Sequence, residues 1–309
     1  MSVMTRCGLW GVFLVFSLRG LASFEALPPE VYLASLVEAH EGQQRPSMNR
    51  HEVLNFIARK KAEDMAERGF FSHLDPEGYG PNFSAHQAGY ALEFGNSPGS
   101  NSIESIGVRH QNRLSENRAA EIVFESWLES PGHRRHVLGE VAQFRDHVSF
   151  GVGYAFASKG PFGWSSHYFV FVSANQDEEA SVSPFVIWKF EQLSLAEMDH
   201  QSDDLDGDGR NTLWEYVLGS SPHVADSEPP FTFSFDRPSH QGLVSLPLKE
   251  PLDPAVDIIV ETTDFSRGSP WSRDGVVRAG RVFRAGSRDD LVRLFRVRLE
   301  HSQFSRLIR

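Results

Sequence analysis

The spacing of hydrophobic residues predicts three long helices in the first half of the chain. Apolar residues recur every three or four positions over residues 27–42, 50–68 and 115–129, as on one face of an amphipathic helix. Gly69 follows the second segment, where a helix-ending glycine is expected. A shorter helix is expected over residues 83–88. This part of the chain is thus predicted to be built mainly from helices.

Two strands are predicted after these helices. Residues 148–154 and 167–172 are short runs rich in β-branched and aromatic residues, and a glycine-rich stretch joins them. Residues 82–109 are rich in Gly and Ser and show little periodicity, so we expect mostly loop there. Helices followed by a strand pair indicate an α+β domain, which we expect to cover residues 27–175.

The rest of the chain predicts a linker and a second domain. Residues 176–202 begin with an acidic run and contain an apolar patch at 185–188, and we expect a solvated connector there. From Phe231 onward, apolar and polar residues alternate, and Pro and Gly separate the runs. This pattern predicts a C-terminal antiparallel β-sandwich over residues 229–309, whose scattered polar residues indicate no chemistry.

The composition is typical of a folded protein with about two domains. Of the 309 residues, 40% are hydrophobic and 23% are charged. The net charge is −11 at pH 7 and the isoelectric point is near 5.6. We therefore do not expect nucleic acid or an anionic membrane surface to be the main partner of this chain.

The first residues have the pattern of an export signal. Arg6 precedes an apolar run at residues 9–18, and small residues suited to cleavage end at Ala22. The run is too short to span a bilayer, so we expect no membrane span. The only cysteine, Cys7, lies inside this segment, which leaves a mature chain without disulfides. We predict a signal peptide at residues 1–22 and a secreted protein, extracellular or periplasmic.

A calcium-binding loop is predicted within residues 203–222. Carboxylates recur at alternate positions, a glycine allows a sharp turn at the sixth position, and a glutamate at the twelfth can close the site. The expected calcium ligands are Asp204, Asp206, Asp208, the carbonyl of Arg210, and Glu215. We expect a short helix ended by Gly219 to follow, and calcium to order the junction between the two domains. The alternative is an acidic interdomain turn without metal.

A histidine is expected in the first turn of a helix that starts after residue 130. Ser130 can cap this helix, and Pro131 suits its first position. His133 then lies near the positive end of the helix dipole, which disfavours the imidazolium form. A neutral imidazole can accept a proton or bind a metal. The alternative is that His133 is a polar residue that only completes a turn.

Four segments, taken in order, give the chain a family resemblance. They are residues 62–73, which end on His73; 103–107, which carry Glu104; 127–138, which contain Ser130-Pro131-Gly132-His133; and 149–174, which contain Gly151-Val152-Gly153-Tyr154. With these segments the chain resembles the CAP superfamily of cysteine-rich secretory, antigen and plant pathogenesis-related proteins, in its cysteine-poor bacterial branch. The resemblance covers about residues 30–175. It implies an α-β-α sandwich for this domain.

The resemblance also implies a cleft formed by His73, Glu104 and His133. The family's second cleft glutamate aligns near Glu129 or Ser130. The two histidines can hold zinc weakly and reversibly, because so few protein ligands are present that water must complete the coordination. The alternative is that Glu104 hydrogen-bonds both histidines and fixes the loops.

Three functions are compatible with the resemblance. The first, which we expect, is an extracellular binding module whose cleft holds a metal or a small-molecule, lipid or surface ligand without turnover. The second is a zinc-dependent, peptidase-like hydrolase that uses Glu104 as general base. The third is an adhesive or structural surface protein with a vestigial cleft, in which the C-terminal β domain provides adhesion.

Overall fold

The computed structural model describes most of the chain between residues 24 and 301. Within that range, the residues left out of the description are 91, 93–96, 176–180, 200–203, 237–240, 250–252, 265–270, 274–275, 280 and 287–292. The predicted signal peptide at residues 1–22 lies outside the described residues. Among the described residues, no helix has both the length and the apolar character needed to cross a membrane.

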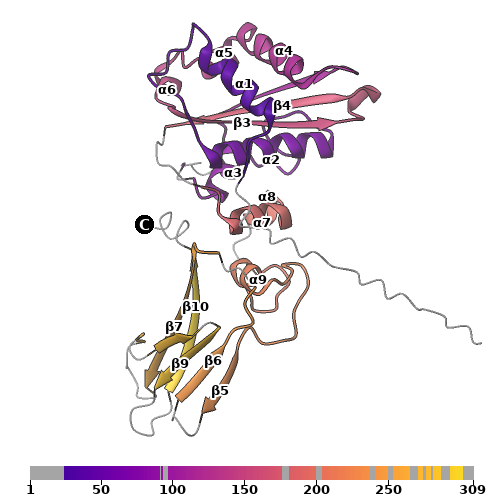
Figure 1. Ribbon diagram of the computed structural model, residues 1–309. Coiled ribbons are helices and arrows are strands. Elements are labelled where there is room, and N and C mark those ends of the chain that lie inside the picture. Colours follow the sequence, from indigo (N-terminus) through magenta and orange to yellow (C-terminus); the bar gives the residue numbers. More distant parts are fainter. Residues whose placement is uncertain are drawn as a thin grey trace, which may run out of the picture.

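The first half of the chain forms a four-stranded sheet with helices on both faces (Figure 1). The strand order is β1-β3-β4-β2. The strands are β1 (Asn49–Arg50), β2 (Glu104–His110), β3 (Ser149–Ala157) and β4 (Ser166–Ala174). β1 pairs with β3 in parallel, and the other pairs are antiparallel. Strands and helices are thus mixed as expected for an α+β domain.

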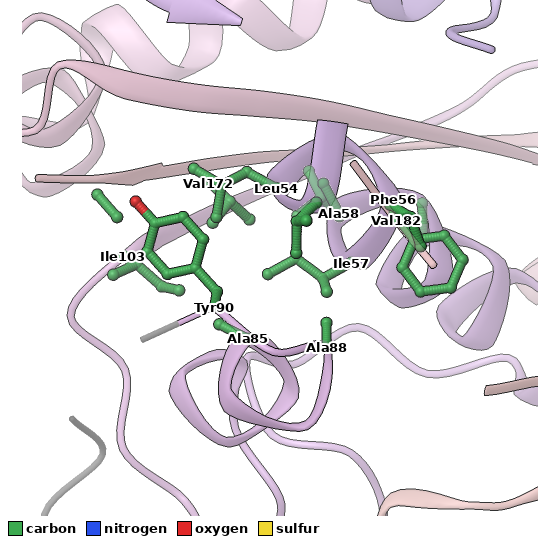
Figure 2. Packing of buried hydrophobic residues seen from close by; sticks show 14 of the residues in the cluster. Leu54, Phe56, Ile57, Ala58, Ala85, Ala88, Tyr90, Ile103, Val172 and Val182 are labelled. Atoms are coloured by element: carbon green, nitrogen blue, oxygen red, sulfur yellow. The ribbon is translucent and has the colours of Figure 1, made fainter. Parts of the chain in front are cut away.

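Each face of the sheet carries its own hydrophobic cluster. Helices α2 (Glu52–Arg68) and α3 (Pro81–Gln87) contribute to one cluster, which Figure 2 shows from close by. Helices α1 (Pro28–Ala39) and α4 (Glu116–Glu129) contribute to the other. Because side chains alternate along a strand, Val170 of β4 joins the first cluster and Phe171 joins the second. The expected α-β-α layering is confirmed.

Two glycines let helix α2 lie directly on strand β3. A Cβ atom added to Gly151 would come within 2.2 Å of the Asn55 nitrogen, and one on Gly153 within 2.0 Å of the Ala58 carbonyl carbon. These distances are far below a normal contact, so only glycine allows this approach. The Gly-Val-Gly pattern is therefore a packing requirement of the fold.

The structure confirms the helices predicted from periodicity and corrects one loop. Helices α1, α2, α3 and α4 overlap the four predicted segments, and Gly69 ends α2 in the left-handed conformation with a φ of 70°. The stretch predicted as loop contains strand β2, whose first four residues are buried on both faces and therefore show no alternation. Shorter elements follow α4: α5 (Pro131–Val137), α6 (Ala142–Arg145) and a 3₁₀ turn η1 (Pro161–Gly163).

The predicted solvated connector is also corrected, because its apolar patch is a packed helix. This region contains α7 (Pro184–Gln192) and α8 (Leu195–Met198). The Ser183 hydroxyl caps α7 by accepting a hydrogen bond from the Val186 amide at 3.2 Å. Val186 is buried in the cluster around α2, whereas Phe185 is buried in a C-terminal cluster. Helix α7 therefore joins the two halves of the chain through its side chains.

The C-terminal part consists of two antiparallel sheets. One has the order β5-β6-β9-β8 and the other pairs β10 with β7. The strands are β5 (Thr232–Asp236), β6 (Gln241–Ser245), β7 (Val256–Asp264), β8 (Val276–Ala279), β9 (Val282–Gly286) and β10 (Arg293–His301). Val244 and Phe283 from the first sheet share one hydrophobic cluster with Val260 from the second. Residues of α7 and of the short helix α9 (Thr212–Leu218) complete this cluster.

Candidate functional site

Helix α2 and strand β2 bring His73 and Glu104 together. His73 lies in the loop after Gly69, and this loop is held by the Asp75 carboxylate, which accepts a hydrogen bond from the Tyr79 amide at 2.7 Å. Glu104 is the first residue of β2. The Nδ1 atom of His73 lies 2.8 Å from Oε1 of Glu104. The His73 side chain is 39% exposed, whereas the Glu104 side chain is fully buried.

This contact determines which nitrogen of His73 is available. An ionised carboxylate can only accept hydrogen bonds, so Nδ1 of His73 is the donor and carries the proton. In the neutral ring, Nε2 then has the free lone pair. The second oxygen of Glu104, Oε2, is buried without a hydrogen-bond partner. Glu104 therefore fixes the orientation of His73 with one oxygen, and its other oxygen has no hydrogen-bond donor.

His133 lies in the first turn of α5, as predicted. Pro131 occupies the start of this helix and Ser130 the N-cap position, but the Ser130 side chain makes no capping hydrogen bond, so that detail of the prediction was wrong. The pKa of His133 is lowered first by burial and then by the positive charge that His73 would carry. The neutral form is favoured as expected, although burial and His73 are the main causes.

His73, Glu104 and His133 line one cleft of about 270 Å³. A larger cleft of about 490 Å³ shares His73 and Glu104 and extends toward α7 and α8. Among the described residues, sets of three metal-type ligand atoms within 4.8 Å of one another occur only between residues 204 and 226. The cleft therefore brings its two histidines and its glutamate to one place without closing them into a compact three-ligand cage.

The position of the second cleft glutamate is not filled by Glu129. Glu129 is exposed at the last position of α4 and does not line either cleft. The next residue, Ser130, does line the smaller cleft. The described part of this cleft thus has one carboxylate, that of Glu104.

A buried polar cluster, which the sequence analysis missed, forms the wall behind the cleft. Nδ1 of His136 lies 2.7 Å from the Ser105 hydroxyl, and its Nε2 lies 2.9 Å from the Ser173 hydroxyl. Nδ1 of His147 lies 3.1 Å from the same Ser173 hydroxyl. Burial first, and then Arg45, lower the pKa of His136 well below its usual value and that of His147 to about 4. Both rings are therefore neutral at pH 7.

Arg45 is the cation of this wall, and all its hydrogen-bond partners are uncharged. Its guanidinium donates to the carbonyls of His136, Val137 and His147 at 2.5, 2.7 and 2.8 Å. It also donates to the Ser173 hydroxyl at 3.2 Å. Burial lowers the pKa of Arg45 to about 10. One arginine thus ties the end of α5 to strand β4 and the segment before β3.

Only one of these residues had a signal in the sequence. His136 follows His133 by three positions, so both lie on neighbouring positions of one helix surface. Arg45 and His147 lie in segments without periodicity, and nothing in their spacing predicts burial.

The predicted calcium loop gathers carboxylates in two overlapping groups. One oxygen from each of Asp204, Asp206 and Asp208 lies within 4.8 Å of the others, and a second group joins Asp208 to Glu215 and Asp226. The amides of Gly207 and Gly209 donate to Asp204, both at 2.9 Å. Asp226 lies outside the motif, eleven positions after Glu215, so sequence spacing alone did not identify it.

Glu215 is the most informative residue of this loop. It is 2% exposed, and neither of its carboxylate oxygens has a hydrogen-bond partner within 3.5 Å. Burial raises the pKa of Glu215, and Asp208 and Asp206 raise it further, while Ser220 acts in the opposite direction. A buried carboxylate among other carboxylates is costly without a compensating cation. The donor set, oxygen atoms only, is the one that calcium prefers.

Arg210 contacts the edge of the loop with its side chain. The guanidinium donates to Asp226 and to the Glu228 carbonyl, and it lies 3.7 Å from Asp208. The carbonyl of Arg210 as a calcium ligand remains a prediction. The side chain neutralises part of the negative charge on the Asp226 side, which leaves Glu215 as the carboxylate without a partner.

Helix α9 connects this loop to the junction between the two halves. The Asn211 side chain caps α9 by accepting from the Trp214 amide at 3.0 Å, and Gly219 ends it in the left-handed conformation, as predicted. The ring of Tyr216 in α9 lies 5.2 Å from that of Phe185 in α7, centre to centre. The helix that follows the loop is therefore packed directly against α7.

Comparisons with known proteins give a family match for one part of the chain. Residues 41–173 match the model of the CAP family, described as the cysteine-rich secretory protein family. A solved structure, that of an extracellular protein containing a SCP domain from Bacillus anthracis str. Ames, is 15% identical with a TM-score of 0.30. That match covers 46% of this chain and 40% of the other. A search of curated proteins gave no significant match. The match to the CAP family is thus established for residues 41–173, which are less than half of the chain but contain all three cleft residues.

Proposed function

We propose that this chain is an extracellular binding protein whose CAP segment holds a divalent transition metal, zinc in the first place, without turnover. The observation that carries the proposal is the contact between Glu104 and His73, which leaves Nε2 of His73 free beside His133. A carboxylate that holds one imidazole nitrogen while the other binds metal is a recurrent arrangement in zinc proteins.

The donor set of the cleft supports weak and reversible binding. His73 and His133 are imidazoles, which suit zinc, and the lowered pKa of His133 keeps it in the form that can bind. Permanent structural zinc sites usually have four protein ligands. With two imidazoles and a glutamate that is already engaged, water must fill the remaining positions.

The position of Glu104 favours binding over hydrolysis. A general base must reach the water or substrate that it deprotonates. The Glu104 side chain is fully buried, and one of its oxygens is engaged with His73. A zinc-dependent, peptidase-like hydrolase remains the alternative, and it predicts peptide turnover that is lost in Glu104→Gln.

Calorimetry with zinc tests the cleft. Zinc is titrated into the calcium-loaded chain, beside the double variant His73→Ala, His133→Ala and the control His223→Ala, which removes an exposed histidine elsewhere. We expect the heat of binding to vanish in the double variant and to persist in the control. Glu104→Gln should weaken binding by about 10-fold to 100-fold, because a neutral amide holds His73 more weakly and makes its ring a poorer ligand. Equal heats for the wild type and the double variant would contradict the proposal and leave Glu104 as a structural bridge.

We further propose that the loop at residues 204–226 binds calcium and stabilises the junction between the two halves of the chain. The buried, unpartnered carboxylate of Glu215 carries this proposal. Calcium takes six to eight oxygen ligands, which Asp204, Asp206, Asp208 and Glu215 supply together with loop carbonyls and water. Asp226 adds a carboxylate from beyond the twelve-residue motif.

A calcium titration with two variants tests this site. Glu215→Gln should abolish binding, and Asp226→Asn should weaken it by about 10-fold, because one of several carboxylates is lost. Asp257→Asn, which changes an exposed aspartate in β7, is the control and should bind calcium normally. Unchanged affinity in Glu215→Gln would show that the loop is an acidic turn without a specific cation.

Export is part of the same proposal. The pattern of residues 1–22 predicts cleavage near Ala22. N-terminal sequencing of the secreted protein should begin shortly after this residue. An intact Met1 in a cytoplasmic fraction would contradict export.

A further inference from the structure

The turn between strands β3 and β4 exposes an unusual group of aromatic side chains. Phe162 is 88% exposed and Trp164 is 52% exposed, and Phe156 lies half-exposed at the end of β3. Single exposed apolar residues are ordinary on a protein surface, whereas clusters mark interaction sites. These three fall within nine consecutive residues and flank the end of the hairpin, where Phe156 contacts the ring of His167 on one face and Phe162 contacts that of His110 on the other. We call residues 156–164, with the adjacent segment 109–113, the aromatic tip.

The backbone of the aromatic tip is strained. Phe162 has a φ of 67° and Arg113 a φ of 58°, and these are the non-glycine residues with positive φ among those that the structure describes. Residues other than glycine, asparagine and aspartate rarely adopt this conformation, and strain of this kind concentrates at functional sites. At Phe162 the strained backbone coincides with a large apolar ring that is 88% exposed.

Hydrogen bonds through Ser165, the residue after Trp164, link the two segments of the tip. The Gln111 amide donates to the Ser165 carbonyl at 2.9 Å, and the Ser165 amide donates to the Asn112 side chain at 2.8 Å. The ring of His110 meets that of Phe162 edge-on, with centres 6.2 Å apart. Phe162 and Trp164 are thus presented on a preformed surface.

The charge of the tip is opposite to that of the chain. Residues 105–115 and 147–176 contain no aspartate or glutamate, although the whole chain has 41 acidic residues and a net charge of −11. The tip exposes Arg109, Arg113 and Lys159. At physiological salt, charges act over about 8 Å, so this local excess decides what the tip attracts. The expectation drawn from net charge does not apply to this surface.

The aromatic tip lies at the far end of the sheet from the cleft. In the pairing of β2 with β4, Glu104 faces Val172 at one end and His110 faces Ser166 at the other. Six residues of strand separate Glu104 from His110, which corresponds to about 20 Å. In Figure 1 this end of the β3–β4 hairpin extends past the helices that cover the sheet. A surface bound at the tip would leave the cleft open.

We propose that the aromatic tip docks the protein on a lipid surface that carries anionic headgroups. Trp and Phe partition into the interface between water and acyl chains, and Lys and Arg beside them bind anionic headgroups. A stable protein partner needs about 800 Å² on each side, which three side chains on a narrow turn do not provide. Insertion of a narrow tip into a bilayer needs no such complementary area.

Vesicle binding of the full secreted chain tests this proposal. Co-sedimentation is measured with phosphatidylcholine vesicles and with vesicles that also contain phosphatidylglycerol. We expect binding to the mixed vesicles, a loss of about 10-fold or more in Phe162→Gly and Trp164→Ser, and a smaller loss in Lys159→Glu. The control Val224→Ser changes an apolar residue outside the tip whose exposure, 64%, lies between those of Phe162 and Trp164, and it should bind like the wild type.

The Phe162→Gly variant separates a binding role from a structural one. Glycine adopts a positive φ without strain, so the melting temperature of this variant should not fall while its vesicle binding does. In addition, brominated lipids should quench part of the tryptophan fluorescence of the wild type. The quenched fraction should be smaller in Trp164→Phe. Equal sedimentation of the wild type and Phe162→Gly, or no sedimentation of the wild type, would overturn the proposal. Retention on a polysaccharide matrix that depends on Phe162, without vesicle binding, would assign the tip to a carbohydrate instead.

Discussion

The cleft and the acidic loop at residues 204–226 each bury a glutamate, but the surroundings of the two carboxylates differ. Glu104 holds His73 with one oxygen, and the wall behind it contains the buried guanidinium of Arg45. Glu215 has no hydrogen-bond partner and lies among aspartates. The first region therefore has a cation of its own near Glu104, Lys61, whose charge interacts with that carboxylate, whereas the proposed calcium site would take its cation from solution. Folding of the first region should be insensitive to ions, and order in the second should depend on calcium.

The largest effect is expected from removing the internal cation. Arg45→Met leaves three backbone carbonyls and the Ser173 hydroxyl without their donor. Loss of such a buried group should lower the free energy of unfolding by about 3–5 kcal/mol, measured by urea denaturation. Arg118→Met removes an exposed arginine in α4 and should leave the free energy of unfolding almost unchanged. Equal effects of the two variants would show that Arg45 does not brace the wall.

Calcium should reverse the effect of a loop substitution on stability. Without calcium, Glu215→Gln should be more stable than the wild type, because it removes a buried charge that has no partner. With calcium at a hundred times its dissociation constant, the wild type gains about 2.7 kcal/mol that the variant does not. Thermal melts in calcium and in chelator measure both differences. If the order of stability is the same in both, Glu215 is not compensated by a bound cation.

The sequence predicted those parts of the fold in which local patterns agree with the final packing. Gly69 ends α2 because the chain adopts the left-handed conformation there, which glycine favours. Gly151 and Gly153 are needed because only glycine allows α2 to approach β3 so closely. Strand β2 was missed because both of its faces are buried, which removes the alternation that identifies a strand. Helix α7 was missed because an acidic run precedes it, although Pro184 marks its start.

The candidate site was predictable in a similar, partial way. Short motifs located His73, Glu104 and His133, and the structure brings them to one cleft. Arg45 and Asp226 were not predictable, because their partners are distant in sequence and they belong to no motif. Arg45 matters because the fold buries it, and Asp226 because the fold brings its carboxylate to Asp208 and Glu215.

Acid should weaken the wall of the cleft, with an intermediate effect. The pKa of His147 is lowered to about 4 by burial and by Arg45, and Asp146 opposes this shift. The unfolded chain therefore binds a proton between pH 6.5 and about 4 that the folded chain does not, so the free energy of unfolding falls as pH falls through this range. The loss should reach about 2 kcal/mol at pH 5. His147→Gln should flatten this slope, and an unchanged slope would assign it to other groups, His136 first.

The smallest effect tests whether the charge of Glu104 is compensated within the protein. Glu104→Gln keeps the shape of the side chain and replaces a charge-assisted hydrogen bond to His73 by a neutral one. Since His73 is partly exposed, the expected loss is about 1 kcal/mol in the free energy of unfolding, and it should be the same with and without calcium. The sign is opposite to that of Glu215→Gln in chelator, because Glu104 has a partner to lose and Glu215 has none. A stabilising effect of Glu104→Gln would mean that the buried Oε2 atom costs more than the contact with His73 gains, and that the cleft, like the loop, depends on a cation from solution.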